Sequence, residues 1–242
     1  MSSWAPAPLR RLALTLVALV AVVVPSLVTE WVLTPPAADV QQRVRDRTDI
    51  LGVVLLREDE VPLVLAQAVV ATEDESFYSH HGVDSIGLGR ALLYDASNFC
   101  LCQGGSTITE QLAKDVYLGG SDRGYNKVED LVLALKIEQV IGKQQILADY
   151  LSVIPTGLNR YGASAASCAY FHAPLGSLTL GQYALLAGVT QAPSLYDPTV
   201  DAAAAVARRS HVLSAMVADK MISKTQAATA NAEPALAQGP GC

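Results

Sequence analysis

Positively charged residues are few in this sequence, and several common patterns are missing from it. Its 242 residues include 17 lysines and arginines against 23 aspartates and glutamates, which gives a net charge of −6. This balance lacks the basic footprint of a nucleic-acid-binding protein, so we expect no nucleic-acid partner. No internal repeat of fixed period occurs. Strand-like patterns are scarce, with one short candidate at 51–56, and the sequence therefore predicts a mostly α-helical domain.

Cysteine is also rare, and its spacing does not fit a zinc site. The four cysteines are Cys100, Cys102, Cys168 and Cys242. The C-x-C spacing is not that of a zinc ribbon, and no second Cys/His pair completes one. Two alternatives stay open: a disulfide from Cys100 or Cys102 to Cys168, which an external compartment permits, or buried free thiols.

The longest apolar stretch lies near the N-terminus. Hydrophobic residues make up 51% of the chain, and residues 12–28 contain no charged side chain. Extended to Leu33, the stretch is just long enough for a membrane helix, which needs about 20 mainly apolar residues. Arg10 and Arg11 favour a cytoplasmic N-terminus at 1–11, a transmembrane helix at 12–33 and an extracytoplasmic remainder. The rival interpretation is a signal peptide cleaved near the sequence TPPAAD.

Composition divides the rest of the chain into three parts. Residues 34–50 are polar, contain a proline pair and are interpreted as a linker. Residues 51–224 show repeated helical spacing of apolar residues and are expected to form the globular domain. Residues 225–242 are low in complexity, and we expect them to be disordered.

The first stretch with chemical potential is VVATEDESFYSHHG, residues 69–82. Glu73 follows Leu65 and Val69 at helical spacing, so its carboxylate is expected at the end of a buried stripe. Partial burial would raise its pKa toward the range that is useful for proton transfer. The alternative is an ordinary helix end that faces water, because runs of acids are mostly exposed.

The second stretch is GGSTITEQLAKDVYL, residues 104–118. Thr107 and Glu110 fit a capping box at the start of a helix. Thr107, Gln111 and Lys114 then share one helical face, next to Ser106. Hydroxyl groups at a helix N-terminus with a lysine further on suit an anionic group such as a phosphate. The alternative is an ordinary capped helix, and the order G-K-[ST] of a Walker A loop is absent.

The third stretch, NKVEDLVLALKIEQ, places charges on a nearly apolar helix. Lys127 and Asp130 are three residues apart, and Arg123 precedes them. Charged groups on a buried helix need partners or a ligand-lined cleft.

Taken in order, these blocks resemble the peptidoglycan glycosyltransferases of family 51. The pattern E-D-x-x-F-x-x-H-x-G is matched from Glu73 to Gly82, and G-G-S-T-I-T-x-Q-L-x-K is matched from Gly104 to Lys114. The likeness covers about residues 60 to 200. These enzymes form the glycan-polymerising domains of class A penicillin-binding proteins and also occur as monofunctional transglycosylases.

The resemblance implies a lysozyme-like helical domain that stands on the outer face of the bacterial membrane behind one anchoring helix. It implies polymerisation of lipid II, a disaccharide-peptide carried on a polyprenyl diphosphate, into β-1,4-linked glycan chains with inversion. The expected partners are lipid II, the growing glycan strand, the membrane and other cell-wall synthesis proteins. A divalent cation, Mg²⁺ or Mn²⁺, is expected at the diphosphate, although no ligand set stands out.

The resemblance also assigns roles by position. Glu73 matches the catalytic base, and Asp130 takes the place of a second functional glutamate. Lys114, Lys127 and Arg123 are expected to stabilise the diphosphate. The remaining positions of the matched motifs are expected to bind substrate; they are Asp74, Phe77, His80, Gly82, Ser106, Thr107 and Gln111.

The sequence departs from the family pattern at several of these positions. Asp130 replaces a glutamate, and Asn126 replaces an arginine. Glu110, Asp115 and Ser152 replace Gln, Asn and Asn respectively. One alternative function therefore stays open, a degenerate lipid II-binding or cell-wall scaffold protein without turnover. A lytic lysozyme-like hydrolase, which also uses one glutamate, is a further alternative. The motifs S-x-x-K and K-T-G do not occur, so we expect no transpeptidase.

Overall fold

The computed structural model describes residues 7–98, 105–119 and 127–237. The α-helices in these ranges are α1 (Ala7–Leu33), α2 (Val40–Leu51), α3 (Leu63–Glu73), α4 (Ser85–Asn98), α5 (Ile108–Tyr117), α6 (Lys127–Ile137), α7 (Lys143–Val153), α8 (Ala163–Phe171), α9 (Leu180–Val189), α10 (Ala202–Ala218) and α11 (Lys224–Asn231). Short 3₁₀ turns are η1 (Ala37–Asp39), η2 (Glu58–Glu60) and η3 (Leu175–Ser177). The mostly α-helical fold that the sequence predicts is confirmed.

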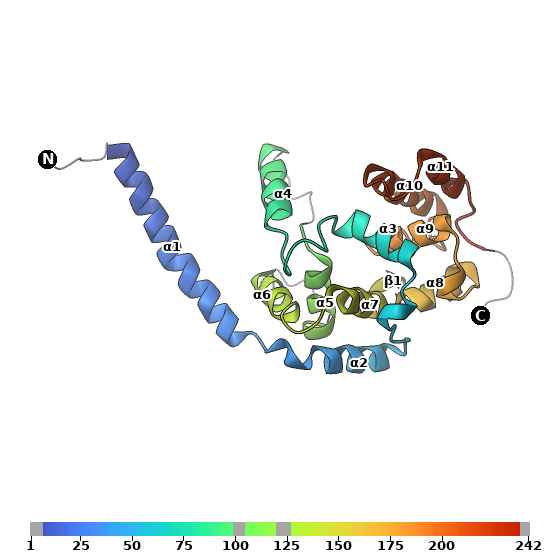
Figure 1. Ribbon diagram of the computed structural model, residues 1–242, viewed down its shortest axis with the longest axis horizontal. Coiled ribbons are helices and arrows are strands. Elements are labelled where there is room, and N and C mark those ends of the chain that lie inside the picture. The colour runs from blue at the N-terminus through green and yellow to red at the C-terminus, as the bar shows by residue number, and fades with distance from the viewer. Residues whose placement is uncertain (1–6, 99–104, 120–126, 238–242) are drawn as a thin grey trace.

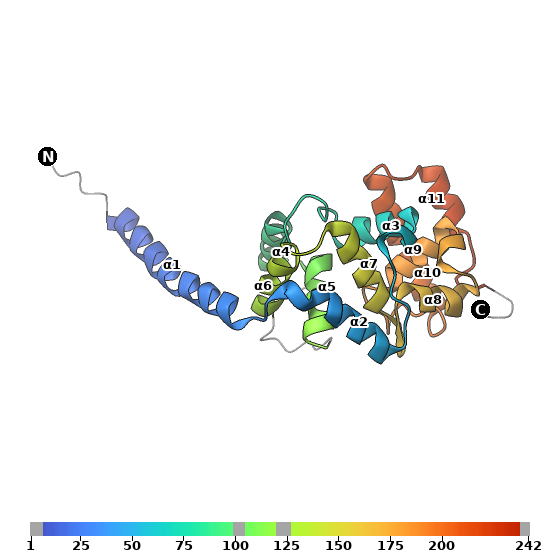
Figure 2. The same ribbon diagram turned by 60° about the horizontal axis from the view of Figure 1, so that its bottom comes forward.

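Two groups of helices build the domain. In one group α3, α9 and α10 pack against one another, and α11 covers α9 and α10. In the other group α5 packs on α6 and α7, while α2 lies across α5 and α7 (Figures 1 and 2). Helix α1 extends away from the rest of the molecule in both views. The candidate site lies where the end of α3 meets the start of α5.

Helix α3 shows how the sequence brings an acid to this junction. Pro62 precedes its first turn, and Leu65 and Val69 are fully buried. Eleven mainly apolar residues form a helix that packs against α9 and α10. The helix ends at Glu73 because Asp74 adopts an extended φ of −161°. The buried stripe therefore delivers Glu73 to the edge of the core, as the spacing predicts.

The prediction of a strand at 51–56 is wrong. In the described part of the chain, the strands are β1 (Pro155–Gly157) and β2 (Arg160–Tyr161), which pair antiparallel. Residues 51–56 meet no partner strand; instead the Leu56 amide donates to the Ser152 hydroxyl at 2.9 Å. A serine on α7 thus supplies the acceptor that a neighbouring strand would have supplied.

The interpretation of residues 34–50 as a linker is also wrong. Helix α2 buries Val40, Val44 and Thr48, which follow one another at helical spacing. The Gln41 side chain adds a hydrogen bond to Asp149 of α7. The polar residues that made this segment look like a linker occupy the outer face of an amphipathic helix.

The tail predicted to be disordered at 225–242 is ordered as far as the structure describes it. Ser223 and Gln226 form a capping box at the start of α11. At its other end, the buried Arg209 donates to the carbonyl oxygens of Asn231 and Glu233, both at 2.6 Å. Alanine-rich sequence is a good helix former, and these two anchors fix it on the domain.

A further expectation concerns the apolar stretch near the N-terminus. Within the described residues, no helix combines the length and apolar character that a membrane crossing requires. The anchor expected at 12–33 is thus not confirmed and stays a prediction.

Cys168 is disulfide-bonded, so the free-thiol alternative is wrong for this residue. The other three cysteines lie outside the described residues, and the predicted pairing with Cys100 or Cys102 stays a prediction.

Candidate active site

The carboxylate of Glu73 is held from two sides at the end of α3. Gln111 of α5 donates its amide to Glu73 Oε2 at 3.2 Å, and Arg208 Nη2 of α10 lies 3.5 Å from Oε1. The Glu73 side chain is only 9% exposed. Burial raises the pKa of Glu73, while the hydrogen bond from Gln111 and the charge of Arg208 act in the opposite direction. The raised pKa predicted from its position is thus confirmed.

Glu73 opens into a cavity of about 400 Å³. Its walls come from the end of α3, the start of α4 and the turn that leads into α5. The lining residues are Glu73, Asp74, Glu75, Asp84, Gly87, Leu88, Arg90, Ala91, Gly105, Ser106, Thr107 and Gln191. The cavity therefore joins the predicted base to the hydroxyl groups of the second sequence block.

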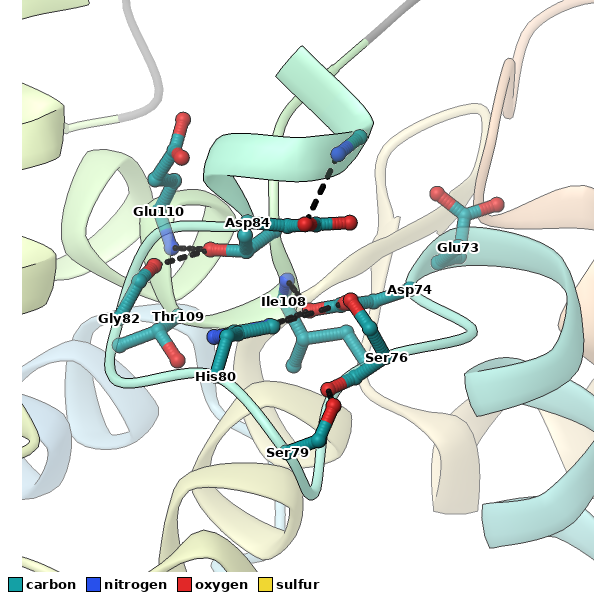
Figure 3. Close-up of polar contacts among 12 residues, drawn as sticks. Glu73, Asp74, Ser76, Ser79, His80, Gly82, Asp84, Ile108, Thr109 and Glu110 are labelled. Atoms are coloured by element: carbon teal, nitrogen blue, oxygen red, sulfur yellow. Dashed lines mark hydrogen bonds and ion pairs between the residues drawn. The ribbon is translucent and has the colours of Figure 1, made fainter. Parts of the chain in front are cut away.

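The neighbouring acid, Asp74, points away from Glu73 and serves the fold (Figure 3). It accepts a hydrogen bond from the Ile108 amide at 3.1 Å and lies 2.9 Å from His80 Nε2. Burial raises the pKa of Asp74, and the hydrogen bond with His80 opposes this shift. Asp74 therefore links the loop after α3 to the first turn of α5. Asp74 also lines part of the cavity wall, whereas His80 does not.

Phe77 and Gly82 also act in packing. Phe77 is fully buried in the core and has no surface to offer a substrate. Gly82 has a φ of +89°, and a Cβ there would lie 2.7 Å from the carbonyl oxygen of Ala134. Phe77, His80 and Gly82 shape the loop that carries the site and do not line the cavity of Glu73, so the substrate contacts predicted for them stay a prediction.

Of the capping box predicted at the start of α5, the Thr107 cap is present and the Glu110 contact is not. Thr107 caps the helix by accepting from the Glu110 amide at 3.1 Å, and its hydroxyl donates to the Gly82 carbonyl at 2.7 Å. The Glu110 side chain does not return to complete a capping box. It forms an ion pair instead with Lys127 at the start of α6. The same Lys127 donates to the Ser106 hydroxyl at 2.8 Å, which brings this cation to the edge of the cavity.

Asp130 lies with Glu110 and Lys127, apart from Glu73. Glu110 is 1% exposed, and burial raises its pKa while Lys127 lowers it. The charge of Asp130 raises the pKa of Glu110 further, so these two acids are neighbours. Asp130 is buried and does not line the cavity that Glu73 lines.

The two remaining cations of the prediction are placed less directly. Lys114 belongs to the last turn of α5, one turn beyond Gln111, and is half-buried. It is not among the described residues that line the cavity. Arg123 lies outside the described residues. Of the two predicted cations that the structure describes, Lys127 is the one that lies at the edge of the cavity.

With this geometry established, comparison with known proteins identifies the family. The family model described as Transglycosylase matches residues 50–217. This chain belongs to the transglycosylase family. The match includes α3, the cavity and Arg208, so it covers the whole candidate site.

Relatives of this transglycosylase are much longer proteins. "Penicillin-binding protein 1A" of Vibrio cholerae is 41% identical over 181 residues, which are 75% of this chain and 22% of the relative. The protein of the same name from Escherichia coli K12 is 40% identical over 168 residues, or 69% and 20% of the two chains. A crystal structure of Penicillin-binding protein 1A from Haemophilus influenzae matches at 26% identity with a TM-score of 0.47, over 77% of this chain and 18% of that one. The transglycosylase chain thus spans about a fifth of the length of these relatives.

Two contacts of this transglycosylase site were not anticipated. Arg208 reaches Glu73 from a helix that the sequence marks only as alanine-rich. The buried Tyr150 donates its hydroxyl to Gln111 Oε1 at 3.1 Å, which fixes the amide so that its nitrogen faces Glu73. Nothing in the local pattern around either residue points to the site, because both contacts join distant parts of the chain.

The described residues do not provide a metal site of their own. No group of three or more His, Cys, Asp or Glu side chains among them is arranged to hold a metal ion. Three acids at or beside the cavity form separate pairs, with Arg208, His80 and Lys127. The divalent cation expected at the diphosphate stays a prediction.

Proposed function

We propose that this chain is a peptidoglycan glycosyltransferase that polymerises lipid II into β-linked glycan chains and releases polyprenyl diphosphate. The observation that carries the proposal is the Glu73 carboxylate, which is buried, opens into a cavity and is held by Gln111 and Arg208. Its position matches the base of the family, and membership of the transglycosylase family supports the activity.

The reaction needs a base that is ionised before it acts. The acceptor sugar hydroxyl loses its proton to Glu73 as its oxygen attacks the anomeric carbon of the donor. Burial makes the Glu73 carboxylate a stronger base than one in water, while Gln111 and Arg208 favour its charged form. Direct displacement inverts the anomeric centre, because the new bond forms on the face opposite the bond that breaks.

The leaving group is a lipid diphosphate, which gains the electron pair of the broken C–O bond. Ser106 and Thr107 line the cavity next to Glu73, and Lys127 donates to Ser106 at its edge. Hydroxyl groups and a cation aimed at the site of developing charge stabilise a leaving anion. We place the diphosphate against this wall, with Lys114 further along α5. Asp130 lies outside the cavity, beside the Glu110–Lys127 pair, and contributes negative charge next to Lys127.

The setting that we propose is the outer face of the bacterial membrane. Lipid II is held in the membrane by its polyprenyl chain, so an anchor at 12–33 would bring enzyme and substrate into one plane. Cell-wall synthesis proteins are proposed as further partners. A divalent ion, if it takes part, would arrive with the diphosphate, and polymerisation with and without a chelator tests this.

The deciding experiment measures glycan polymer from purified full-length chain and lipid II. We expect polymer from the wild type and a loss of about 10²–10⁴-fold in Glu73→Gln, which removes the base. Glu60→Gln, a change of the same kind at an exposed turn, should keep the wild-type rate. Folded wild-type chain that binds lipid II without making polymer would overturn the proposal in favour of a binding protein. Release of fragments from preformed cell wall would overturn it in favour of a hydrolase.

A further inference from the structure

We infer that Arg208 is a positioning residue: it orients the Glu73 carboxylate and keeps it ionised without touching the substrate itself. The inference rests on the proposed function, because it assigns how the base of that reaction is prepared. It concerns a residue of α10, which packs in the same group of helices as α3 but lies more than a hundred positions after Glu73 in the chain.

The two oxygens of Glu73 have different partners on different helices. Arg208 Nη2 of α10 lies 3.5 Å from Oε1, and Gln111 Nε2 of α5 lies 3.2 Å from Oε2. A carboxylate held at both oxygens has little freedom to rotate. The Arg208 side chain is 12% exposed and is not among the described residues that line the cavity. It therefore acts on the reaction through Glu73.

The fold holds Arg208 in this place by a close approach of two helices. Its Nε donates to the Gly188 carbonyl of α9 at 3.4 Å. A Cβ at Gly188 would lie 2.9 Å from Arg208 Cγ, so a residue without a side chain is needed here to make room for the arginine side chain. The guanidinium also stands 5.9 Å from the centre of the Tyr196 ring, a distance at which a cation and a ring attract each other.

The groups that face Glu73 shift its pKa in opposite directions, and Arg208 is one of the two that lower it. The neighbouring Asp74 raises the pKa of Glu73, and so does burial, which is the largest influence. From α5, Gln111 offers a neutral amide, and behind it Tyr150 carries a hydroxyl whose own pKa is raised by burial. From α9, Gly188 has no side chain. Around the cavity that Glu73 lines, further charges come from Glu75, Asp84 and Arg90. Among the described residues, Arg208 is the cation that forms an ion pair with Glu73.

Burial already outweighs the opposing groups in the wild type, and removal of this cation should raise the pKa of Glu73 further. An opposite charge within about 4–6 Å lowers the pKa of an acid by about 1–3 units. Arg208→Met should therefore raise the pKa of Glu73 by about one unit or more. Arg208→Lys keeps the charge and should leave the pKa close to that of the wild type. Gly188→Ala keeps the arginine but displaces it, so it should raise the pKa as Arg208→Met does.

The first test does not depend on activity. The carboxyl carbons of full-length chain labelled with ¹³C-glutamate are titrated by NMR, and the Glu73 signal is the one missing from Glu73→Gln. We expect an upward shift of its titration in Arg208→Met and Gly188→Ala but not in Arg208→Lys. An unchanged titration in Arg208→Met, or an equal shift in Arg208→Lys, would overturn the inference. This readout stands even if the chain makes no polymer, so it separates the two proposals.

The second test uses the pH dependence of polymerisation. We expect the acidic limb of the kcat profile to move up by about one pH unit in Arg208→Met, a tenfold loss on that limb, with little change in KM. Arg57→Met, which removes an exposed arginine whose ion pairs are with Asp59 and Glu60, should leave the limb unchanged. A thermal melt of each variant checks folding. A uniform loss of kcat at all pH values, with no movement of the limb, would reduce Arg208 to a merely structural role.

Discussion

The ammonium group of Lys127 lies against the buried carboxylate of Glu110, where α6 begins beside the first turn of α5. The same ammonium donates to Ser106 on the cavity wall. The resemblance places glutamine at position 110 in the family, so this chain has an acid where the family has a neutral amide. Glu110 therefore competes with the substrate diphosphate for the charge of Lys127.

Glu110→Gln should release part of this charge toward the cavity and lower the KM for lipid II. Lys127 is 45% exposed, and an ion pair with that much solvent access is worth at most about 1 kcal/mol. The expected decrease in KM is therefore roughly fivefold or less, with kcat little changed. Steady-state polymerisation over a range of lipid II concentrations measures it.

Glu129→Gln is the matched control for this change. It removes one acid from the same turn of α6 without touching the Glu110–Lys127 pair, and it should leave KM as in the wild type. A rise in KM in Glu110→Gln, equal to that in Lys127→Met, would show that Glu110 is needed to place Lys127. That result would contradict the competition described above.

Local spacing made part of this site predictable. Leu65, Val69 and Glu73 lie on one face of a helix, and the period of 3.6 residues alone places the acid at the end of the buried stripe. The cap at Thr107 follows in the same way from side-chain chemistry within four residues. Both predictions depend on contacts within one element, which a sequence pattern records directly.

Contacts between distant elements were not predictable in this way. Arg208 is 135 residues from Glu73, and nothing in its alanine-rich helix distinguishes it from a surface arginine. Glu110 was expected to turn back onto its own helix, but Lys127 offers a charged partner that the local pattern does not contain. The polar face of α2 similarly hid its buried Val40 and Val44, because composition averages over both faces of a helix.

Gly82 offers a test of how the loop after α3 is built. Gly82→Ala should destabilise the fold by about 2–4 kcal/mol, from backbone strain at a φ of +89° and from a collision with the backbone of α6. Thermal or denaturant unfolding of the full chain measures this. Gly52→Ala is the control, since Gly52 also has a positive φ of +65° but open space around it. Equal losses in the two variants would show that the collision with α6 contributes nothing.

Asp149 makes stability depend on pH in a direction unusual for a carboxylate. It is fully buried on α7 and accepts hydrogen bonds from Gln41 and Gln145. Burial raises its pKa from 3.8 to about 6. Between these values the folded chain holds more protons at this position than the unfolded chain does. The contribution of Asp149 to stability is therefore full below about pH 4 and is lost as the pH rises through 6.

Asp149→Asn should remove this dependence. The shift from 3.8 to about 6 corresponds to about 3 kcal/mol, and the neutral amide can still bond both glutamines if one of them rotates. We therefore expect the variant to be more stable than the wild type at pH 7.5 by up to this amount, and to lose less stability between pH 4.5 and 7.5. Urea unfolding at the two pH values measures the difference. Asp46→Asn removes an exposed carboxylate that also accepts from a glutamine, Gln42, and should leave the pH dependence as in the wild type. If Asp149→Asn retains the full pH dependence of stability, another acid must cause it. That result would show that Asp149 is not protonated in the folded chain in this pH range.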